Sequence, residues 1–106
     1  MNYRQNVRRG ARVLDSINPD WYRKINPDIL DIADYKRCVL GQLYENFWYA
    51  CKDLELSYES AIYYGFNVRS EDTEDGHSYN DLTKYWKEEI ARRMNPGGPP
   101  PPPGHP

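Results

Sequence analysis

Cys38 is the strongest candidate nucleophile in this sequence, because Lys36 and Arg37 precede it where a helix is predicted to begin. A helix N-terminus beside cations lowers the pKa of a thiol and makes it reactive. A free cysteine is, however, among the residue types that are most often buried. No Gly-x-Ser-x-Gly motif, phosphate-binding loop or paired-histidine zinc motif accompanies Cys38. We therefore predict a buried thiol and a protein that is not an enzyme.

Two groups of acidic residues resemble metal sites. Asp28, Asp31 and Asp34 are evenly spaced, but they lie in a region punctuated by proline, where turn caps and solvated charges are more common. The segment 72–76 resembles the start of a calcium-binding loop. When Gly76 is placed at the sixth loop position, Leu82 takes the twelfth, where a glutamate is needed. We predict neither a metal nor a cofactor.

Two features suggest nucleic-acid binding. The first twelve residues contain no acid and four arginines, at positions 4, 8, 9 and 12. The segment 51–61 resembles the turn of a helix-turn-helix, although Glu55 takes the place of the usual glycine. The helix that would read the bases contains Glu59 and neither lysine nor arginine, whereas phosphate neutralisation supplies most of the affinity for nucleic acid. Nucleic-acid binding is therefore the alternative function.

Protein recognition is the function we expect. The sequence has ten Tyr, three Trp and two Phe, which is more than a core of this size needs, although tyrosines often cover the rim of a core. Tyr, Trp and Arg also dominate interface hot spots. Trp48 and Tyr49 lie at or outside the apolar arc of their predicted helix. The predicted surface for a protein partner, or for self-association, combines Arg4, Arg8, Arg12, Trp48 and Tyr49.

The sequence resembles a family of small actinobacterial and actinobacteriophage proteins without a known activity. The resemblance is carried by Cys-Val-Leu-Gly-Gln-Leu-Tyr at 38–44, Gly-Phe at 65–66, and Tyr-Asn-Asp-Leu-Thr at 79–83 followed by Trp86. It implies no active site. It does imply a phage or prophage accessory protein that acts in the cytoplasm of a host cell.

Hydrophobic periodicity predicts a mainly helical fold of four to five short helices. A first amphipathic helix spans Arg4–Ile17 and ends at Asn18-Pro19. The segment 29–32 fits either a short strand or a helical turn. The strongest periodicity predicts one core helix over Arg37–Glu55, where Gly41 indicates close approach of another backbone, by Trp21 or the first helix.

Capping residues place the remaining helices. Ser57 is suited to cap a short helix that runs to Tyr64, with Gly65 in the left-handed conformation and Phe66 folding back. An acidic loop follows at 69–76. Ser78 and Asp81 resemble a capping box for a last helix over Tyr79–Arg93.

The chain of 106 residues and net charge −2 predicts one helical domain, residues 1–94, and a disordered tail, residues 95–106, with five consecutive prolines. Such a run favours a polyproline II rod. No apolar stretch has the roughly 20 residues of a membrane helix. Cys38 and Cys51 are expected about 20 Å apart on one helix, too far for a disulfide. These observations predict a cytoplasmic protein.

Overall fold

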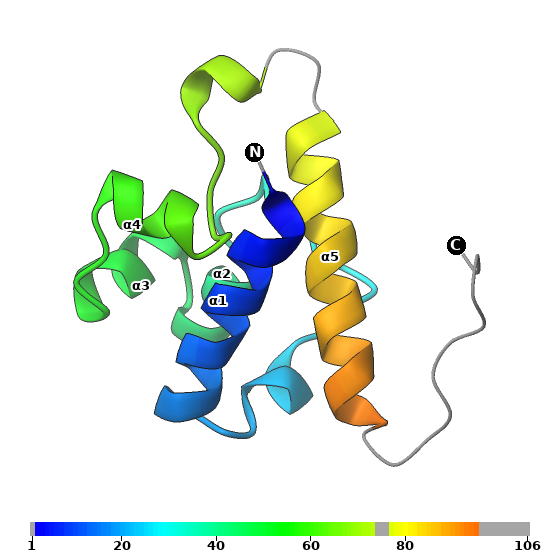
Figure 1. Ribbon diagram of the computed structural model, residues 1–106. Coiled ribbons are helices and arrows are strands. Elements are labelled where there is room, and N and C mark those ends of the chain that lie inside the picture. Colours follow the sequence, from blue (N-terminus) through cyan, green and yellow to red (C-terminus); the bar gives the residue numbers. More distant parts are fainter. Residues whose placement is uncertain (1, 74–76, 96–106) are drawn as a thin grey trace.

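The computed structural model describes residues 2–73 and 77–95 and confirms the mainly helical fold (Figure 1). No strand occurs in these residues. The elements are α1 (Tyr3–Ile17), η1 (Trp21–Lys24), α2 (Val39–Tyr44), α3 (Phe47–Asp53), α4 (Tyr58–Tyr63), η2 (Ser70–Asp72) and α5 (His77–Met94), η denoting a 3-10 helix.

The two long helices, α1 and α5, lie side by side and form the centre of the molecule (Figure 1). Two fully buried tryptophans, Trp21 and Trp86, pack edge to face with ring centroids 5.7 Å apart. Phe66 stacks on the ring of Trp86, with centroids 5.3 Å apart. Burial of such large rings is a major stabilising contribution in a small domain.

Close backbone approach between α1 and the end of α4 depends on two glycines. A Cβ atom at Gly10 would lie 2.0 Å from the carbonyl oxygen of Tyr64. Gly65 adopts a left-handed φ of +75°, as its place after α4 predicts. Its carbonyl accepts a 2.7 Å hydrogen bond from the indole of Trp86. These contacts hold the C-terminal end of α4 against α1 and α5.

The prediction of one helix over 37–55 was wrong, because the segment divides into α2 and α3. Glu45 takes a left-handed φ of +79°, and the Asn46 side chain accepts the backbone N–H of Tyr49 at 2.8 Å as the cap of α3. Asparagine is a strong N-cap residue, so Asn46 was the available signal. The break re-aims α3 and, with it, Trp48.

Two capping predictions had different outcomes. Ser57 caps α4 through a 3.0 Å bond from the Ser60 amide, as predicted. The capping box at Ser78 was wrong, since α5 begins at His77 and includes Ser78. The Ser78 hydroxyl instead donates to the carbonyl of Asp72 at 2.7 Å and accepts from the Tyr3 hydroxyl at 3.1 Å.

The connecting segments complete the core without regular structure. Residues 29–32 form turns and irregular backbone, with Leu30 and Ile32 buried. A Cβ at Gly41 would meet the backbone of residues 35–36, so the predicted close approach is present with a different partner. The last part of the acidic loop, 74–76, and the predicted tail from residue 96 lie outside the described residues. None of the helices in the described part of the chain has the length and apolar character that crossing a membrane requires.

Candidate functional site

The three arginines of the predicted surface line the junction of α1 with α5. Arg4 lies 3.4 Å from Glu88 and stands over the ring of Tyr85, 4.7 Å from its centroid. Arg8 lies 3.9 Å from Glu89. Arg12 lines a hollow of about 600 Å³ at the same junction. We call this region the charged seam; its residues are Arg4, Arg8, Arg12, Asp15, Glu88, Glu89, Arg92 and Arg93.

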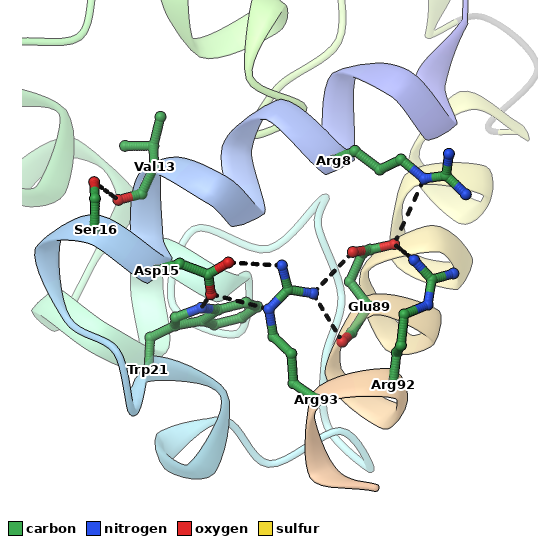
Figure 2. Close-up of polar contacts among 8 residues, drawn as sticks. All are labelled: Arg8, Val13, Asp15, Ser16, Trp21, Glu89, Arg92 and Arg93. Atoms are coloured by element: carbon green, nitrogen blue, oxygen red, sulfur yellow. Dashed lines mark hydrogen bonds and ion pairs between the residues drawn. The ribbon is translucent and has the colours of Figure 1, made fainter. Parts of the chain in front are cut away.

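Arg93 is the centre of the charged seam (Figure 2). Its guanidinium donates to both carboxylate oxygens of Asp15, at 2.9 and 2.8 Å, and to Glu89 at 2.8 Å. Asp15 also accepts the indole N–H of buried Trp21 at 2.8 Å. Arg92 donates to the second oxygen of Glu89 at 2.9 Å. The carboxylates are therefore held in place by arginines from the same fold.

The pKa values of the seam agree with this pairing. Hydrogen bonding from Arg93 holds the pKa of Asp15 below its usual range. The bonds to Asp15 and Glu89 raise the pKa of Arg93 further above neutrality. The Glu89 side chain is only 6% exposed, so its charge is screened by the arginines rather than by water. The geometry indicates that most of the seam is a structural ion-pair network.

A second surface feature is a groove of about 640 Å³ on the α3–α4 side of the molecule. Figure 1 places α3 and α4 on one side of α1 and α5 on the other. The groove is lined by the segment after residue 31, by α3, by the start of α4, by residues 66–73 and by the first turn of α5. We call it the aromatic groove, after its lining residues Tyr35, Phe47, Trp48, Tyr58, Phe66 and Tyr79.

The lining of the aromatic groove contains no charged residue. Several of its lining residues are buried apolar side chains, among them Ala61, Phe66 and Val68. Trp48 lines the groove and is nevertheless 69% exposed. Its volume falls within the roughly 300–1,000 Å³ of ordinary ligand pockets. Such a surface suits an uncharged ligand with apolar faces.

Some polar groups of the groove make hydrogen bonds within the protein, and others do not. The Tyr58 hydroxyl accepts the amide of Ser70 at 2.9 Å, and the Tyr79 hydroxyl donates to the Asn67 side chain at 3.0 Å. The Trp48 indole N–H and the Tyr35 hydroxyl make no hydrogen bond within the described residues. The groove therefore has two fixed tyrosines and two hydrogen-bond donors that an external group can use.

Cys38 is a structural residue in this fold. It is 3% exposed, and its sulfur accepts the amide of Gly41 at 3.2 Å as the cap of α2. Burial raises the pKa of the Cys38 thiol to about 11, against the lowering that its basic neighbours suggest. Cys51 also lines the groove, and burial raises its pKa. Both cysteines are free thiols, although the one-helix argument for their separation was wrong.

Two of the three predicted acidic side chains, Asp31 and Asp34, act as turn caps. One carboxylate oxygen of Asp34 accepts the amides of Lys36 and Arg37 at 2.8 and 3.0 Å, which lowers the pKa of Asp34. Asp31 accepts the amide of Ala33 at 3.0 Å. Within residues 2–73 and 77–95, no group of three or more potential ligands is arranged to hold a metal ion.

The turn between α3 and α4 has the backbone of a helix-turn-helix at one decisive residue. Glu55 adopts a left-handed φ of +56° at the position where that motif usually has glycine. The helix α4, however, contains no basic residue, and its one charged side chain, Glu59, is paired with Arg69 through hydrogen bonds of 3.0 and 2.7 Å. The turn geometry therefore favours a helix-turn-helix that binds nucleic acid, whereas the lack of basic residues in α4 disfavours it.

The structure does not bring the five predicted surface residues into one patch. The three arginines lie along the charged seam, whereas Trp48 lies in the aromatic groove and Tyr49, 62% exposed, lies beside it without lining it. Sequence reasoning missed Tyr35, Tyr58 and Tyr79, since only the tertiary structure places them in the lining of the same groove as Trp48. It also missed Asp15, although the Glu89–Arg93 pair was visible from its spacing.

Comparison with protein-family models, curated proteins and solved structures found no match to this chain.

Proposed function

We propose that this protein is a non-enzymatic accessory protein of phage or prophage origin that binds a protein in the host cytoplasm through its aromatic groove. The exposure of Trp48 is the observation that carries the proposal. An indole that is 69% exposed beside buried apolar walls leaves a large apolar area in contact with water. Tryptophan is also enriched among the hot spots of protein interfaces. The phage origin rests on the sequence resemblance alone.

The groove is favoured over the charged seam because most arginines of the seam already have partners. Arg8, Arg92 and Arg93 face carboxylates of the same chain. A partner that used them would have to compete with these ion pairs. The groove offers apolar area and two available donors without such competition.

The experiment compares Trp48→Ala with Tyr49→Ala. The two residues are neighbours on α3 and are similarly exposed, but only Trp48 lines the groove. The tagged full chain captures partners from actinobacterial lysate treated with nuclease, and each captured protein is then titrated with both variants. We expect Trp48→Ala to weaken binding at least tenfold, an ordinary hot-spot effect, and Tyr49→Ala to change it by less than about twofold. Equal binding by wild type and Trp48→Ala would contradict the proposal.

A helix-turn-helix-like nucleic-acid binder is the second candidate, favoured by the left-handed φ of Glu55. It requires arginines of α1 to neutralise phosphates, because α4 contributes no basic residue. Arg12 is the first candidate, since it makes no ion pair within residues 2–73 and 77–95, whereas Arg4 and Arg8 do. The affinity of such a binder for a DNA duplex would fall steeply with salt and would fall further in Arg12→Ala. Under the proposal above, the duplex does not bind at physiological salt, and Arg12→Ala leaves protein binding unchanged.

A further inference from the structure

We propose that the ligand of the aromatic groove is a proline-rich segment, and specifically Pro99–Pro103 of a second copy of this chain. This inference rests on the proposed function, because it names the partner of the same groove. Three properties of the chain support it: the chemistry of the groove, the composition of the segment that follows α5, and the distance between them.

The chemistry of the groove matches a proline run. Proline has no backbone N–H, so a run of prolines offers ring faces and carbonyl acceptors but no backbone donors. Its polyproline II conformation leaves every carbonyl open to a partner, and aromatic-lined grooves are the known docking sites for such rods. The groove supplies the complementary groups: aromatic faces at Tyr58 and Tyr79, and unengaged donors at Trp48 and Tyr35.

The groove and the proline-rich segment are alike in lacking charged side chains. The lining of the groove contains no Asp, Glu, Lys or Arg. The sequence from residue 95 to 104, Asn-Pro-Gly-Gly followed by five prolines and a glycine, likewise contains no charged side chain. A charged peptide or a nucleic acid would gain no ion pair in the groove and would lose solvation there. An uncharged proline run has no charged group whose solvation would be lost in the groove.

The length of the linker favours a second copy over the same chain. Tyr79, which lines the groove, lies fifteen residues before Met94, so about 22 Å of helix separates it from the end of α5. The five steps from Met94 to Pro99 span at most about 18 Å. Figure 1 places the end of α5 across α1 from α3 and α4. The nearer edge of the groove, at Ile32, is bonded to Thr83, eleven residues or about 17 Å of helix before Met94. The linker must therefore be almost fully extended before the run of prolines, about 16 Å long, can enter the groove of its own chain, whereas the tail of a second copy has no such constraint.

The test measures the mass of the full chain in solution from micromolar to millimolar concentration, by sedimentation or light scattering. We expect wild type and Tyr49→Ala to associate as concentration rises. A variant with Pro99–Pro103 replaced by alanine and the variant Trp48→Ala should both remain monomeric. Trp48 and Tyr49 are both more than half exposed, so these two truncations are not expected to unfold the chain.

A second measurement follows Trp48 directly. A synthetic peptide of residues 95–106 is titrated into the five-alanine variant, whose own tail does not compete. Trp21 and Trp86 are fully buried, so a change in tryptophan fluorescence reports mainly on Trp48. We expect a saturable blue shift of the tryptophan fluorescence when the peptide binds the five-alanine variant. A five-alanine chain that also carries Trp48→Ala should bind the peptide at least tenfold more weakly, as measured by calorimetry.

The outcomes separate this inference from the proposed function. Peptide binding with a monomeric wild-type chain whose Trp48 is already shifted would place the tail in its own groove and overturn the second-copy proposal. Absence of peptide binding, with a lysate partner still lost in Trp48→Ala, would overturn the proline ligand and leave the proposed function intact. Absence of peptide binding, with no partner sensitive to Trp48→Ala, would overturn both.

Discussion

The charged seam and the aromatic groove are both rich in residues that bind partners elsewhere, yet they differ in how far their own fold satisfies them. In the seam, Arg93 donates to Asp15 and Glu89, and both carboxylates have further partners. In the groove, the Trp48 side chain is 69% exposed, and its N–H makes no hydrogen bond within the described residues. The seam therefore stabilises the fold, and the groove is the surface at which we propose that a partner binds. Residue type alone does not distinguish the two, because arginine and tryptophan are both common in interfaces.

Gly10→Ala should have the largest effect on stability, because α1 packs against both α5 and α4. The new Cβ would collide with the Tyr64 carbonyl, at 2.0 Å, and would crowd the ring of Trp86. We expect a loss of about 3 kcal/mol or more in the free energy of unfolding, measured by chemical denaturation. Gln5→Ala, at an exposed position of the same helix, is the control and should change stability by less than about 0.5 kcal/mol. A Gly10→Ala protein of wild-type stability would show that α1 and the end of α4 are not in close contact.

Arg93→Ala tests the structural role of the seam. It removes three hydrogen bonds to carboxylates and leaves Glu89, whose side chain is 6% exposed, with fewer partners. We expect a loss of about 2 kcal/mol in the free energy of unfolding. Arg92→Ala is the matched control, since its half-exposed side chain makes one ion pair and should contribute about 0.5 kcal/mol or less. Equal effects of the two variants would mean that the network has no centre at Arg93.

Asp15→Asn should change the dependence of stability on pH. The pKa of Asp15 is lower in the folded state than its ordinary 3.8, chiefly through the hydrogen bonds from Arg93. The unfolded chain therefore binds a proton at higher pH than the folded chain does. The resulting stabilisation is complete above the ordinary pKa and is lost as pH falls through the lower, folded value.

The measurement is the melting temperature of wild type and Asp15→Asn between pH 7 and pH 2. Because the Asp15 side chain is 41% exposed, solvent screening limits the difference at pH 7 to about 1 kcal/mol. That difference should shrink as the solution becomes acidic. A constant difference over the whole range would show that the Asp15 charge contributes nothing to the seam.

Trp48→Ala and Tyr49→Ala should have the smallest effect on stability. Both side chains are more than half exposed, so each truncation should change the free energy of unfolding by less than about 0.5 kcal/mol. The two variants should differ only in binding. If Trp48→Ala instead lowered the free energy of unfolding as much as Arg93→Ala does, Trp48 would be part of the core. The groove would then contribute to stability as the seam does.

Local signals in the sequence were sufficient for several elements. The helical class, the amphipathic first helix, the Ser57 cap and the left-handed Gly65 were all predicted, because each depends on periodicity or on one residue's own conformational preference. The break between α2 and α3 was missed. Asn46 lay inside an apolar pattern that continued on both sides of it, so the pattern outweighed the cap.

The sequence by itself thus determined the helical class, the burial of Cys38 and the presence of more aromatic residues than the core needs. Only the tertiary structure decided how those residues are used. Arg8 and Arg12 line the same hollow as Arg93 because two helices far apart in the chain pack side by side. Trp48 lines the same groove as Tyr35, Tyr58 and Tyr79 because the chain turns at Glu45 before α3 begins. Periodicity assigns a side chain to a face of its own helix, but the neighbour of that face depends on packing across the whole chain.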